Sequence, residues 1–239
     1  MDFTLPEHVE ALRQEVRKFA EKEIRPHVME WDETKTYPME VIKRLGGMGM
    51  LGIIFPEEYG GAGMGYIEYA VVVEELSRVC GSVGISIAAH NSLCSNHIYA
   101  MGNEAQKQKY LKPLASGKAI GAWGLTEPGA GSDAGAQLTS ARKEGSHYVL
   151  NGTKNFITHG TVGEIAVVMA RTSPGKGTNG ISAFILEKGM PGFHAGRRNQ
   201  LKSRHHGRRI ACRTAQTATS RTMTFADTLH RKRRLARQV

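Results

Sequence analysis

Residues 123–133 read Trp-Gly-Leu-Thr-Glu-Pro-Gly-Ala-Gly-Ser-Asp, and this stretch decides which fold we expect. It begins like an aromatic β-strand and runs into a loop of glycine and proline that carries the hydroxyl groups of Thr126 and Ser132. Consecutive backbone N–H groups in such a loop can form a concave site for an anion. A purely structural turn would use the same glycines without requiring the two hydroxyl groups. The stretch therefore predicts a strand and loop that bind a flat polar ring and a phosphate.

Downstream of this loop, the chain has the short apolar or β-branched runs of a sheet. Asn151-Gly152 is the strongest turn signal among them, because both residues tolerate the positive φ of a type I′ hairpin turn. We expect a small antiparallel sheet or barrel over residues 119–196. Its strands are expected at 138–142, 147–150, 153–157, 165–170 and 181–186.

A second candidate group lies in the run that follows this turn. Residues 154–160 read Lys-Asn-Phe-Ile-Thr-His-Gly. Phe156 and Thr158 are two residues apart, so on a strand they would face the same side. An aromatic ring beside a hydroxyl group suits the edge of a redox ring system, although an ordinary hairpin strand would be the preferred interpretation of this segment if it stood alone.

Upstream of residue 119 the pattern is helical. Thr4-Leu5-Pro6-Glu7 predicts a capping box that opens a first helix, and Pro26 is expected to stop it. Pro38 predicts the start of a second, short helix. Three more helices are expected, and together they make residues 1–118 an all-α domain; they cover 66–79, 83–101 and 104–115.

Two motifs in this helical half could be read as ligand sites, but we favour ordinary explanations. The loop Gly60–Gly65 lacks the terminal GK[ST] of a Walker loop and the βαβ context of a dinucleotide site, so a chain reversal is preferred. His90, Cys94 and His97 fall at i, i+4 and i+7 of one helix, which places the third ligand a turn too far for one ion. We therefore predict buried core positions and no metal site.

Composition limits the class of protein. A chain of 239 residues that is 40% hydrophobic suits one or two globular domains. No run approaches the roughly 18 apolar residues of a membrane span. The first residues do not resemble a targeting segment, which predicts a cytoplasmic location. Cys80, Cys94 and Cys212 form no CxxC pair, so we expect reduced thiols.

The charge of the chain changes abruptly at residue 197. Residues 1–196 hold 19 Lys and Arg against 21 Asp and Glu, whereas residues 197–239 hold 13 basic residues and one acid, Asp227. This basic stretch has too few large apolar side chains for a core, so it is expected to be disordered. The abrupt change suggests a shifted reading frame. Alternatively, a native tail of this kind could bind nucleic acid or an acidic membrane.

Three motifs, taken in order, resemble the acyl-CoA dehydrogenase family of flavoproteins. They are FPEEYGGAG at 55–63, LTEPGAGSD at 125–133 and NGTKNFIT at 151–158, and the wording is nearest to the short-chain, butyryl-type branch. The similarity covers residues 1 to about 196. It implies an α+β multi-domain protein with an N-terminal helical domain (1–118), a middle β-barrel (119–196) and a C-terminal helical domain.

The resemblance also implies an activity and a cofactor. The family uses FAD for the α,β-dehydrogenation of acyl-CoA thioesters, here short- to medium-chain ones from fatty-acid or branched-chain amino-acid degradation. A carboxylate removes the α-proton while the β-hydrogen leaves as hydride. Thr126 would donate near flavin N1/O2, Thr158 would bond N5/O4, and Ser132 would also lie beside the thioester. The implied FAD-binding residues are Trp123, Leu125, Thr126, Gly131, Ser132, Phe156 and Thr158.

The family's catalytic carboxylate belongs to the C-terminal helical domain, which the similarity does not reach. We therefore predict no catalytic residue in this chain, an incomplete barrel, a missing C-terminal domain, weak or no FAD retention, and no turnover by the chain alone. The implied partners are acyl-CoA and electron-transfer flavoprotein, with no nucleic acid. Family members are homo-oligomers, which is doubtful for this chain. A non-catalytic partner of a complete paralogue is a further alternative.

Overall fold

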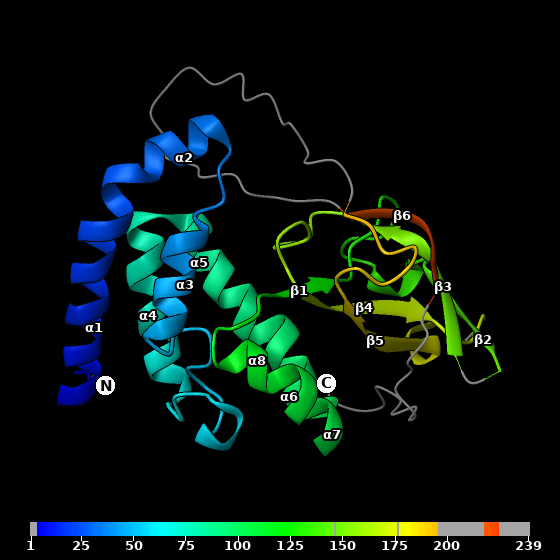
Figure 1. Ribbon diagram of the computed structural model, residues 1–239, viewed down its shortest axis with the longest axis horizontal. Coiled ribbons are helices and arrows are strands. Elements are labelled where there is room, and N and C mark those ends of the chain that lie inside the picture. Colours follow the sequence, from blue (N-terminus) through cyan, green and yellow to red (C-terminus); the bar gives the residue numbers. More distant parts are fainter. Residues whose placement is uncertain (1–3, 146, 176, 196–217, 225–239) are drawn as a thin grey trace. The chain divides into compact units, whose positions relative to one another are not determined.

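The computed structural model describes residues 4–145, 147–175, 177–195 and 218–224, which fall into two compact units (Figure 1). The first unit comprises residues 4–99 and 107–119 of the described chain and is helical. The second comprises 100–106, 120–195 and 218–224 and contains the sheet. Within the described ranges, no helix has the length and apolar character that crossing a bilayer requires.

The predicted helices 66–79, 83–101 and 104–115 are confirmed. Two of them contain a π-helical turn, so each consists of several consecutive elements. The helical elements are α1 (Glu7–Phe19), η1 (Ala20–Ile24), η2 (Arg25–His27), α2 (Val28–Thr34), α3 (Met39–Gly47), η3 (Glu57–Tyr59), α4 (Tyr66–Val79), α5 (Gly81–Ala88), η4 (Ala89–Ser95), α6 (Asn96–Met101), α7 (Glu104–Gln106), η5 (Lys107–Leu111) and α8 (Lys112–Ala115).

The start of α1 and the role of Pro26 differ from the prediction. Pro6 is the N-cap of α1, no side chain caps the helix, and the Pro6 carbonyl accepts hydrogen bonds from Val9 and Glu10. The capping box expected at residues 4–7 is therefore not formed. Pro26 does not stop the helical path either, because it lies in the first turn of η2, where a missing N–H costs nothing.

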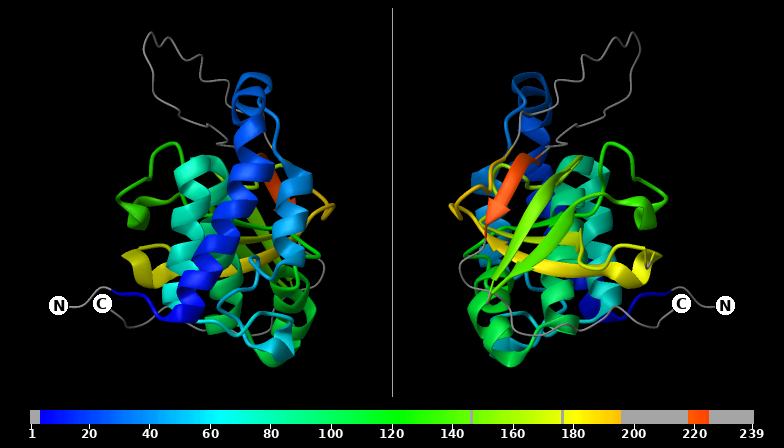
Figure 2. Two further views of the ribbon diagram at one scale, coloured as in Figure 1. Left: turned by 90° about the vertical axis from the view of Figure 1, so that its left-hand side faces the viewer. Right: turned by 90° about the vertical axis from the view of Figure 1, so that its right-hand side faces the viewer.

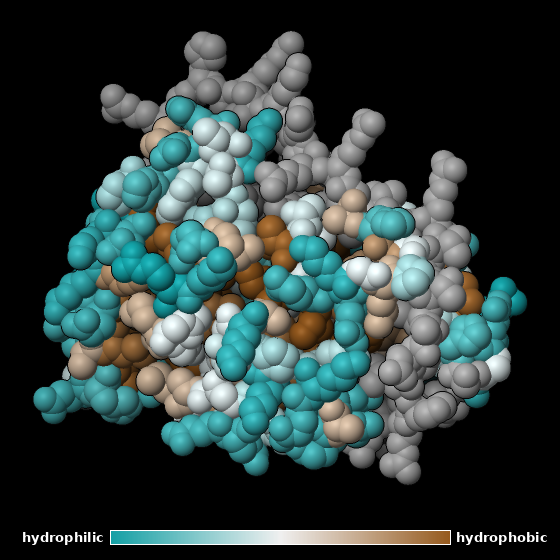
Figure 3. Space-filling view, viewed as in Figure 1, coloured by the Kyte–Doolittle hydropathy of each residue, from teal (hydrophilic) through white to brown (hydrophobic). Residues whose placement is uncertain are grey.

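Helix α1 packs along α4 (Figures 1 and 2) through an apolar stripe and one buried carboxylate. Glu75 of α4 is 1% exposed and accepts hydrogen bonds from Arg17 at 2.8 and 2.9 Å, from Arg13 at 3.1 Å and from Arg78 at 3.2 Å. Above all the hydrogen bonds from Arg17 lower the pKa of Glu75 to about 2, although burial opposes them. The arginines reach solvent, and Figure 3 shows hydrophilic side chains over much of this unit's visible face.

The second unit is built on one mixed sheet, so the prediction of an antiparallel sheet is wrong. Strands β1 and β4 run parallel with Gly121 opposite Ile165, and β2 meets β4 in parallel at Ser140 and Arg171. Parallel strands need a long crossover, and the β2–β3 hairpin lies within the connection from β1 to β4. The order is β1-β4-β2-β3-β6, with β5 also on β4. The elements are β1 (Gly121–Gly124), η6 (Ala134–Ala136), β2 (Ser140–Glu144), β3 (His147–Lys154), β4 (Ile165–Arg171), η7 (Gly177–Gly180), β5 (Ile181–Glu187) and β6 (Ala218–Thr224).

The hairpin turn predicted at Asn151-Gly152 is also wrong. Strand β3 runs through these residues without a break, and β2 and β3 turn at Gly145, which has φ +57°. Gly152 is needed for another reason, because a Cβ there would lie 2.7 Å from the Cα of Thr139. The β3–β6 register also shifts between Leu150 and Gly152. The glycine thus permits a close backbone approach rather than a reversal.

The strand expected at 153–157 ends early. Strand β3 stops at Lys154, and Phe156 has a left-handed φ of +57°. Phe156 and Thr158 therefore do not share the face of one strand, which corrects their predicted arrangement. Behind them, the core of the sheet consists of small and branched side chains on which Tyr148 and Phe184 pack edge to face at 5.3 Å. Its buried members are Ala122, Ala141, Leu150, Ile157, Ala166, Val168, Ala170, Phe184 and Leu186.

Part of the basic stretch that the sequence predicted to be disordered is a strand. Ala218–Thr224 forms β6, which pairs antiparallel with β3 (Figure 2). The rest of that stretch, including Cys212, lies outside the described residues. The limits 1–118, 119–196 and 197–239 stay predictions, as does closure of the sheet into a barrel.

Candidate functional site

The first half of the candidate site is the end of β1 and the loop after it. Along β1, Ala122 and Gly124 face the core, so the half-buried Trp123 lies on the opposite face of the strand. Leu125 and Thr126 follow and are half-buried. The predicted aromatic strand that runs into a loop is confirmed.

The loop then leaves its backbone accessible. Glu127 and Ala130 close a small turn through two backbone hydrogen bonds of 2.9 and 3.2 Å. Beyond it, Gly131 and Ser132 are exposed, and a Cβ at Gly129 or Gly131 would meet no heavy atom within 4 Å. The backbone of the loop is therefore open to a ligand on this side.

The second half of the site is the segment from Lys154 to His159. Phe156 is 56% exposed and Thr158 is half-buried, while Ile157 between them is inserted in the core. The left-handed φ values of Phe156 (+57°) and His159 (+65°) set this arrangement. A left-handed backbone conformation is uncommon for a residue other than glycine, and it places the ring of Phe156 in an exposed position. Such conformations are often found at functional sites.

His159 anchors the end of this segment to β1. Its Nδ1 lies 2.8 Å from the carbonyl oxygen of Gly121, and its side chain is buried. Burial lowers the pKa of His159 to about 4, and the hydrogen bond to Gly121 only partly opposes this. The ring is therefore neutral at pH 7, and Nδ1 carries the proton that it donates to the carbonyl oxygen.

The two halves meet through the backbone. The N–H of Asn155 donates to the carbonyl oxygen of Thr126 at 2.7 Å. The predicted residues are thus brought together as two adjacent segments, with Leu125 and Thr126 on one and Phe156 and Thr158 on the other. Gly131 and Ser132 lie further along the exposed loop.

Directly behind this junction lies a buried ion pair to which the sequence analysis assigned no role. Lys154 Nζ is 2.7 Å from Glu127 Oε1, and the two side chains are 3% and 5% exposed. The sequence did contain a signal for this pair, because Glu127 lies in the motif 125–133 and Lys154 lies in the motif 151–158. Charged residues that become buried are almost always paired.

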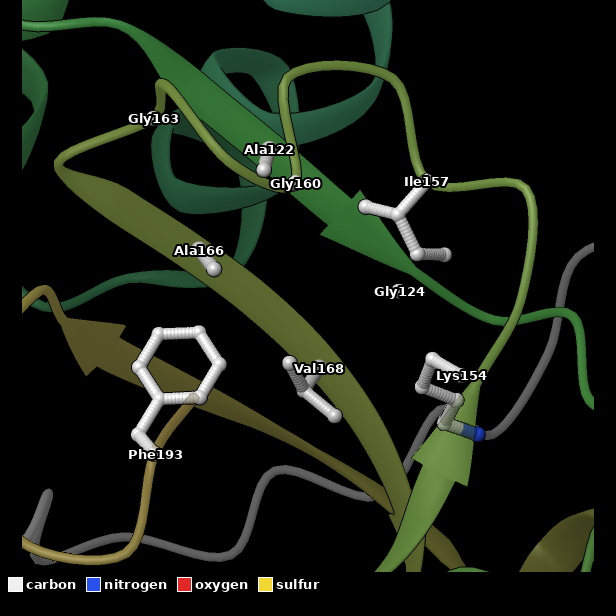
Figure 4. A pocket seen from close by; sticks show the side chains of 9 residues that line it. All are labelled: Ala122, Gly124, Lys154, Ile157, Gly160, Gly163, Ala166, Val168 and Phe193. Carbon is white, nitrogen blue, oxygen red and sulfur yellow. The ribbon is translucent and has the colours of Figure 1, made fainter. Parts of the chain in front are cut away.

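The described part of this unit also contains an apolar pocket (Figure 4). None of the seven predicted FAD-binding residues lines it. Lys154 contributes its aliphatic stem, and its nitrogen points away from Phe193 and Val168. The lining is Ala122, Gly124, Lys154, Ile157, Gly160, Gly163, Ala166, Val168 and Phe193.

Of the two other motifs in the helical unit, the glycine loop has the ordinary explanation that we favoured, whereas among the three candidate metal ligands His90 and Cys94 are buried and His97 is half-buried. The glycine loop is a chain reversal: Gly61 donates to Pro56, and a Cβ at Gly61 would lie 2.1 Å from the Phe55 carbonyl oxygen. His90 is buried and its Nε2 lies 3.2 Å from the Leu114 carbonyl oxygen. Across the described ranges, no group of three or more His, Cys, Asp or Glu could hold a metal ion.

Comparison with known proteins gives a consistent assignment. Residues 6–118 match the acyl-CoA dehydrogenase N-terminal domain, and residues 122–212 match the acyl-CoA dehydrogenase middle domain. The chain is 55% identical over 200 residues to the short-chain specific acyl-CoA dehydrogenase of Clostridium acetobutylicum, covering 84% of this chain and 53% of that protein. It spans about half the length of the curated relatives it matches.

Solved structures agree. The butyryl-CoA dehydrogenase of Megasphaera elsdenii superimposes with a TM-score of 0.86 at 39% identity, over 95% of this chain and 58% of that one. The glutaryl-CoA dehydrogenase of Mycobacterium smegmatis in complex with FADH2 superimposes with a TM-score of 0.79 at 32% identity, over 92% and 54%.

Proposed function

Because this chain belongs to the acyl-CoA dehydrogenase family, we propose that its sheet unit holds FAD for the dehydrogenation of a short-chain acyl-CoA. FAD supplies the hydride acceptor when it is bound. The observation that carries the proposal is the hydrogen bond from Asn155 to the Thr126 carbonyl oxygen, which sets the loop 125–132 beside the segment 155–158.

The residues of these two segments fit a flavin. The exposed ring of Phe156 and the half-buried ring of Trp123 offer flat apolar contacts, and the hydroxyl groups of Thr126 and Thr158 can bond polar atoms at a ring edge. The open backbone at Gly131 and the hydroxyl group of Ser132 suit a pyrophosphate and the thioester end of acyl-CoA.

The proposal assigns binding and orientation to these residues and assigns no proton acceptor to them. Glu127 is not available as a base, because its carboxylate is buried and occupied by Lys154 and by two backbone N–H groups. Electron-transfer flavoprotein as the electron acceptor, closure of the sheet into a barrel, the domain limits 1–118 and 119–196, and a cytoplasmic location belong to the same proposal.

The test is a titration of the purified chain with FAD, followed by flavin fluorescence and absorbance. We expect weak but saturable binding with a shifted flavin spectrum. Thr126→Val removes one hydrogen-bonding hydroxyl group and should weaken binding about tenfold, whereas Thr178→Val, at an exposed threonine outside the two segments, should not. Failure to saturate, or equal affinities for the two variants, would contradict the proposal.

A further inference from the structure

Lys154 and Glu127 form a buried ion pair that binding of a flavin does not by itself require. Their side chains are 3% and 5% exposed, and burying a charge is costly unless it is paired and fully hydrogen-bonded. Apolar residues such as methionine and leucine in place of both members of the pair could fill a similar volume without the cost of burying two charges. The contacts of the pair therefore indicate what it does.

The ammonium group of Lys154 uses its three donors on both ends of one loop. It donates to the Leu125 carbonyl oxygen at 2.9 Å, to Glu127 Oε1 at 2.7 Å and to Gln137 Oε1 at 2.8 Å. Leu125 and Glu127 flank Thr126 at the start of the loop, and Gln137 lies where the loop returns toward β2. The Lys154 ammonium group thus joins the first residues of the loop to the point where the loop returns toward β2.

Glu127 closes the same junction from the other side. Its Oε1 accepts the N–H of Thr139 at 3.0 Å, and its Oε2 accepts the N–H of Leu138. Burial alone would raise the pKa of Glu127, but the hydrogen bonds from Lys154, Leu138 and Thr139 outweigh it and lower the pKa. Burial lowers the pKa of Lys154, and Glu127 partly restores it. Each group therefore favours the charged form of the other.

The pair also reaches the second segment through the chain itself. Lys154 is the last residue of β3, and the next residue, Asn155, donates its N–H to the carbonyl oxygen of Thr126. Lys154, which binds Leu125 and Glu127, is therefore the direct chain neighbour of Asn155, which binds Thr126.

We propose that Lys154 and Glu127 are positioning residues that set the register of the loop carrying Thr126 against the segment carrying Phe156 and Thr158. This inference rests on the proposed flavin function for its purpose, but the register itself is a property of the chain. Without the pair, the loop would keep its covalent ends and lose the contacts that hold Leu125 and Gln137 to the end of β3.

The first experiment needs no ligand. Amide hydrogen exchange is compared in the native chain, in Lys154→Met, and in Lys143→Met, which removes an exposed lysine of β2 as a matched control. Methionine keeps the aliphatic stem that lines the apolar pocket. We expect exchange at Thr139 and Asn155 to rise in Lys154→Met at least tenfold more than exchange at Val167 and Ile185, which pair between β4 and β5 and report any general loss of stability.

Three outcomes are informative. A larger rise in exchange over residues 125–139 and 155–158 than in β4 and β5 supports the positioning role. Unchanged exchange there overturns it, and so does a rise no larger than the one in β4 and β5, which would mean that the pair contributes only general stability. Glu127→Gln, which keeps the side-chain volume, provides a second variant if Lys154→Met does not fold, and it should raise exchange at the same amides.

The second experiment links the register to the flavin. The FAD dissociation constant should rise at least tenfold in Lys154→Met and Glu127→Gln, with a changed visible circular dichroism of the bound flavin, and should be unchanged in Lys143→Met. Native flavin spectra and affinity in the two variants would overturn the positioning role. If the native chain binds no FAD while the exchange result is as expected, the proposed function fails and the register role stands.

Discussion

Among the described residues, each unit contains one buried glutamate that pairs with basic side chains, Glu75 in one and Glu127 in the other, and the two sites differ in whether those basic side chains reach solvent. Around Glu75, the side chains of Arg13, Arg17 and Arg78 are 32%, 46% and 41% exposed. Around Glu127, the partner Lys154 is 3% exposed. The first site joins α1 to α4 through arginines that remain partly exposed to solvent. In the second site, both charged groups are buried where the loop after β1 meets the end of β3. A charge pair can therefore stabilise helix packing in one place and set loop geometry in another.

The largest loss of stability should come from breaking the buried Lys154–Glu127 pair. Lys154→Met leaves the Glu127 carboxylate buried without its cation, which typically costs about 3–5 kcal/mol. Urea denaturation followed by Trp123 fluorescence, in a Trp31→Phe background, measures the loss in the sheet unit. A loss below about 1 kcal/mol, the range of exposed pairs, would mean that the two carboxylates do not differ as described.

The next effect concerns pH in the sheet unit. The pKa of His159 is lowered to about 4 in the folded chain from 6.5, so the unfolded chain binds the proton first as pH falls. Stability should be lost between pH 6.5 and about 4, by up to about 3 kcal/mol. His159→Asn keeps an N–H donor for the Gly121 carbonyl oxygen and should remove this dependence. An unchanged pH profile in the variant would contradict the assignment.

A smaller loss of stability is expected at Glu75 and its arginines in the helical unit. Glu75→Gln removes a carboxylate but leaves arginines that reach water, so we expect a loss of about 1.5–3 kcal/mol, the range of hydrogen bonds to charged groups. Because the folded pKa of Glu75 lies near 2, its contribution is present above pH 4.5 and is lost as pH falls toward 2. Circular dichroism at 222 nm across this range should show a flatter acid transition in the variant.

The smallest effect is expected in the open loop. A Cβ at Gly131 meets nothing within 4 Å, so Gly131→Ala should change stability by less than about 0.5 kcal/mol. The same change should weaken FAD binding if the loop wraps a pyrophosphate. Calorimetry and the FAD titration together separate these effects, and a large drop in melting temperature would show that the loop is packed rather than open.

The sequence predicted elements whose signals are local. The helix over 66–79 and the strands near 165–170 and 181–186 follow from periodicity within each segment, and the structure confirms them. The candidate FAD residues also came from contiguous motifs. Their positions are now known, and their roles stay predictions.

What the sequence could not predict depends on residues far apart in the chain. Asn151-Gly152 has the composition of a turn, but Thr139 approaches Gly152 so closely that a Cβ at this position of β3 would clash with it. The parallel pairing of β1 and β4 joins residues separated by the whole β2–β3 hairpin. The Lys154–Glu127 pair spans 27 positions and becomes visible only when the end of β3 is placed beside the loop that follows β1.

The parallel register of β1 also has a consequence for biosynthesis. Gly121 lies opposite Ile165, so the described partner of β1 leaves the ribosome only after the hairpin between them has been made. Until then the nascent chain has an unpaired strand next to a glycine-rich loop, and such long-range pairing is slow and prone to aggregation. Synthesis of the chain through β4 is therefore the earliest moment at which β1 can take its described place in the sheet.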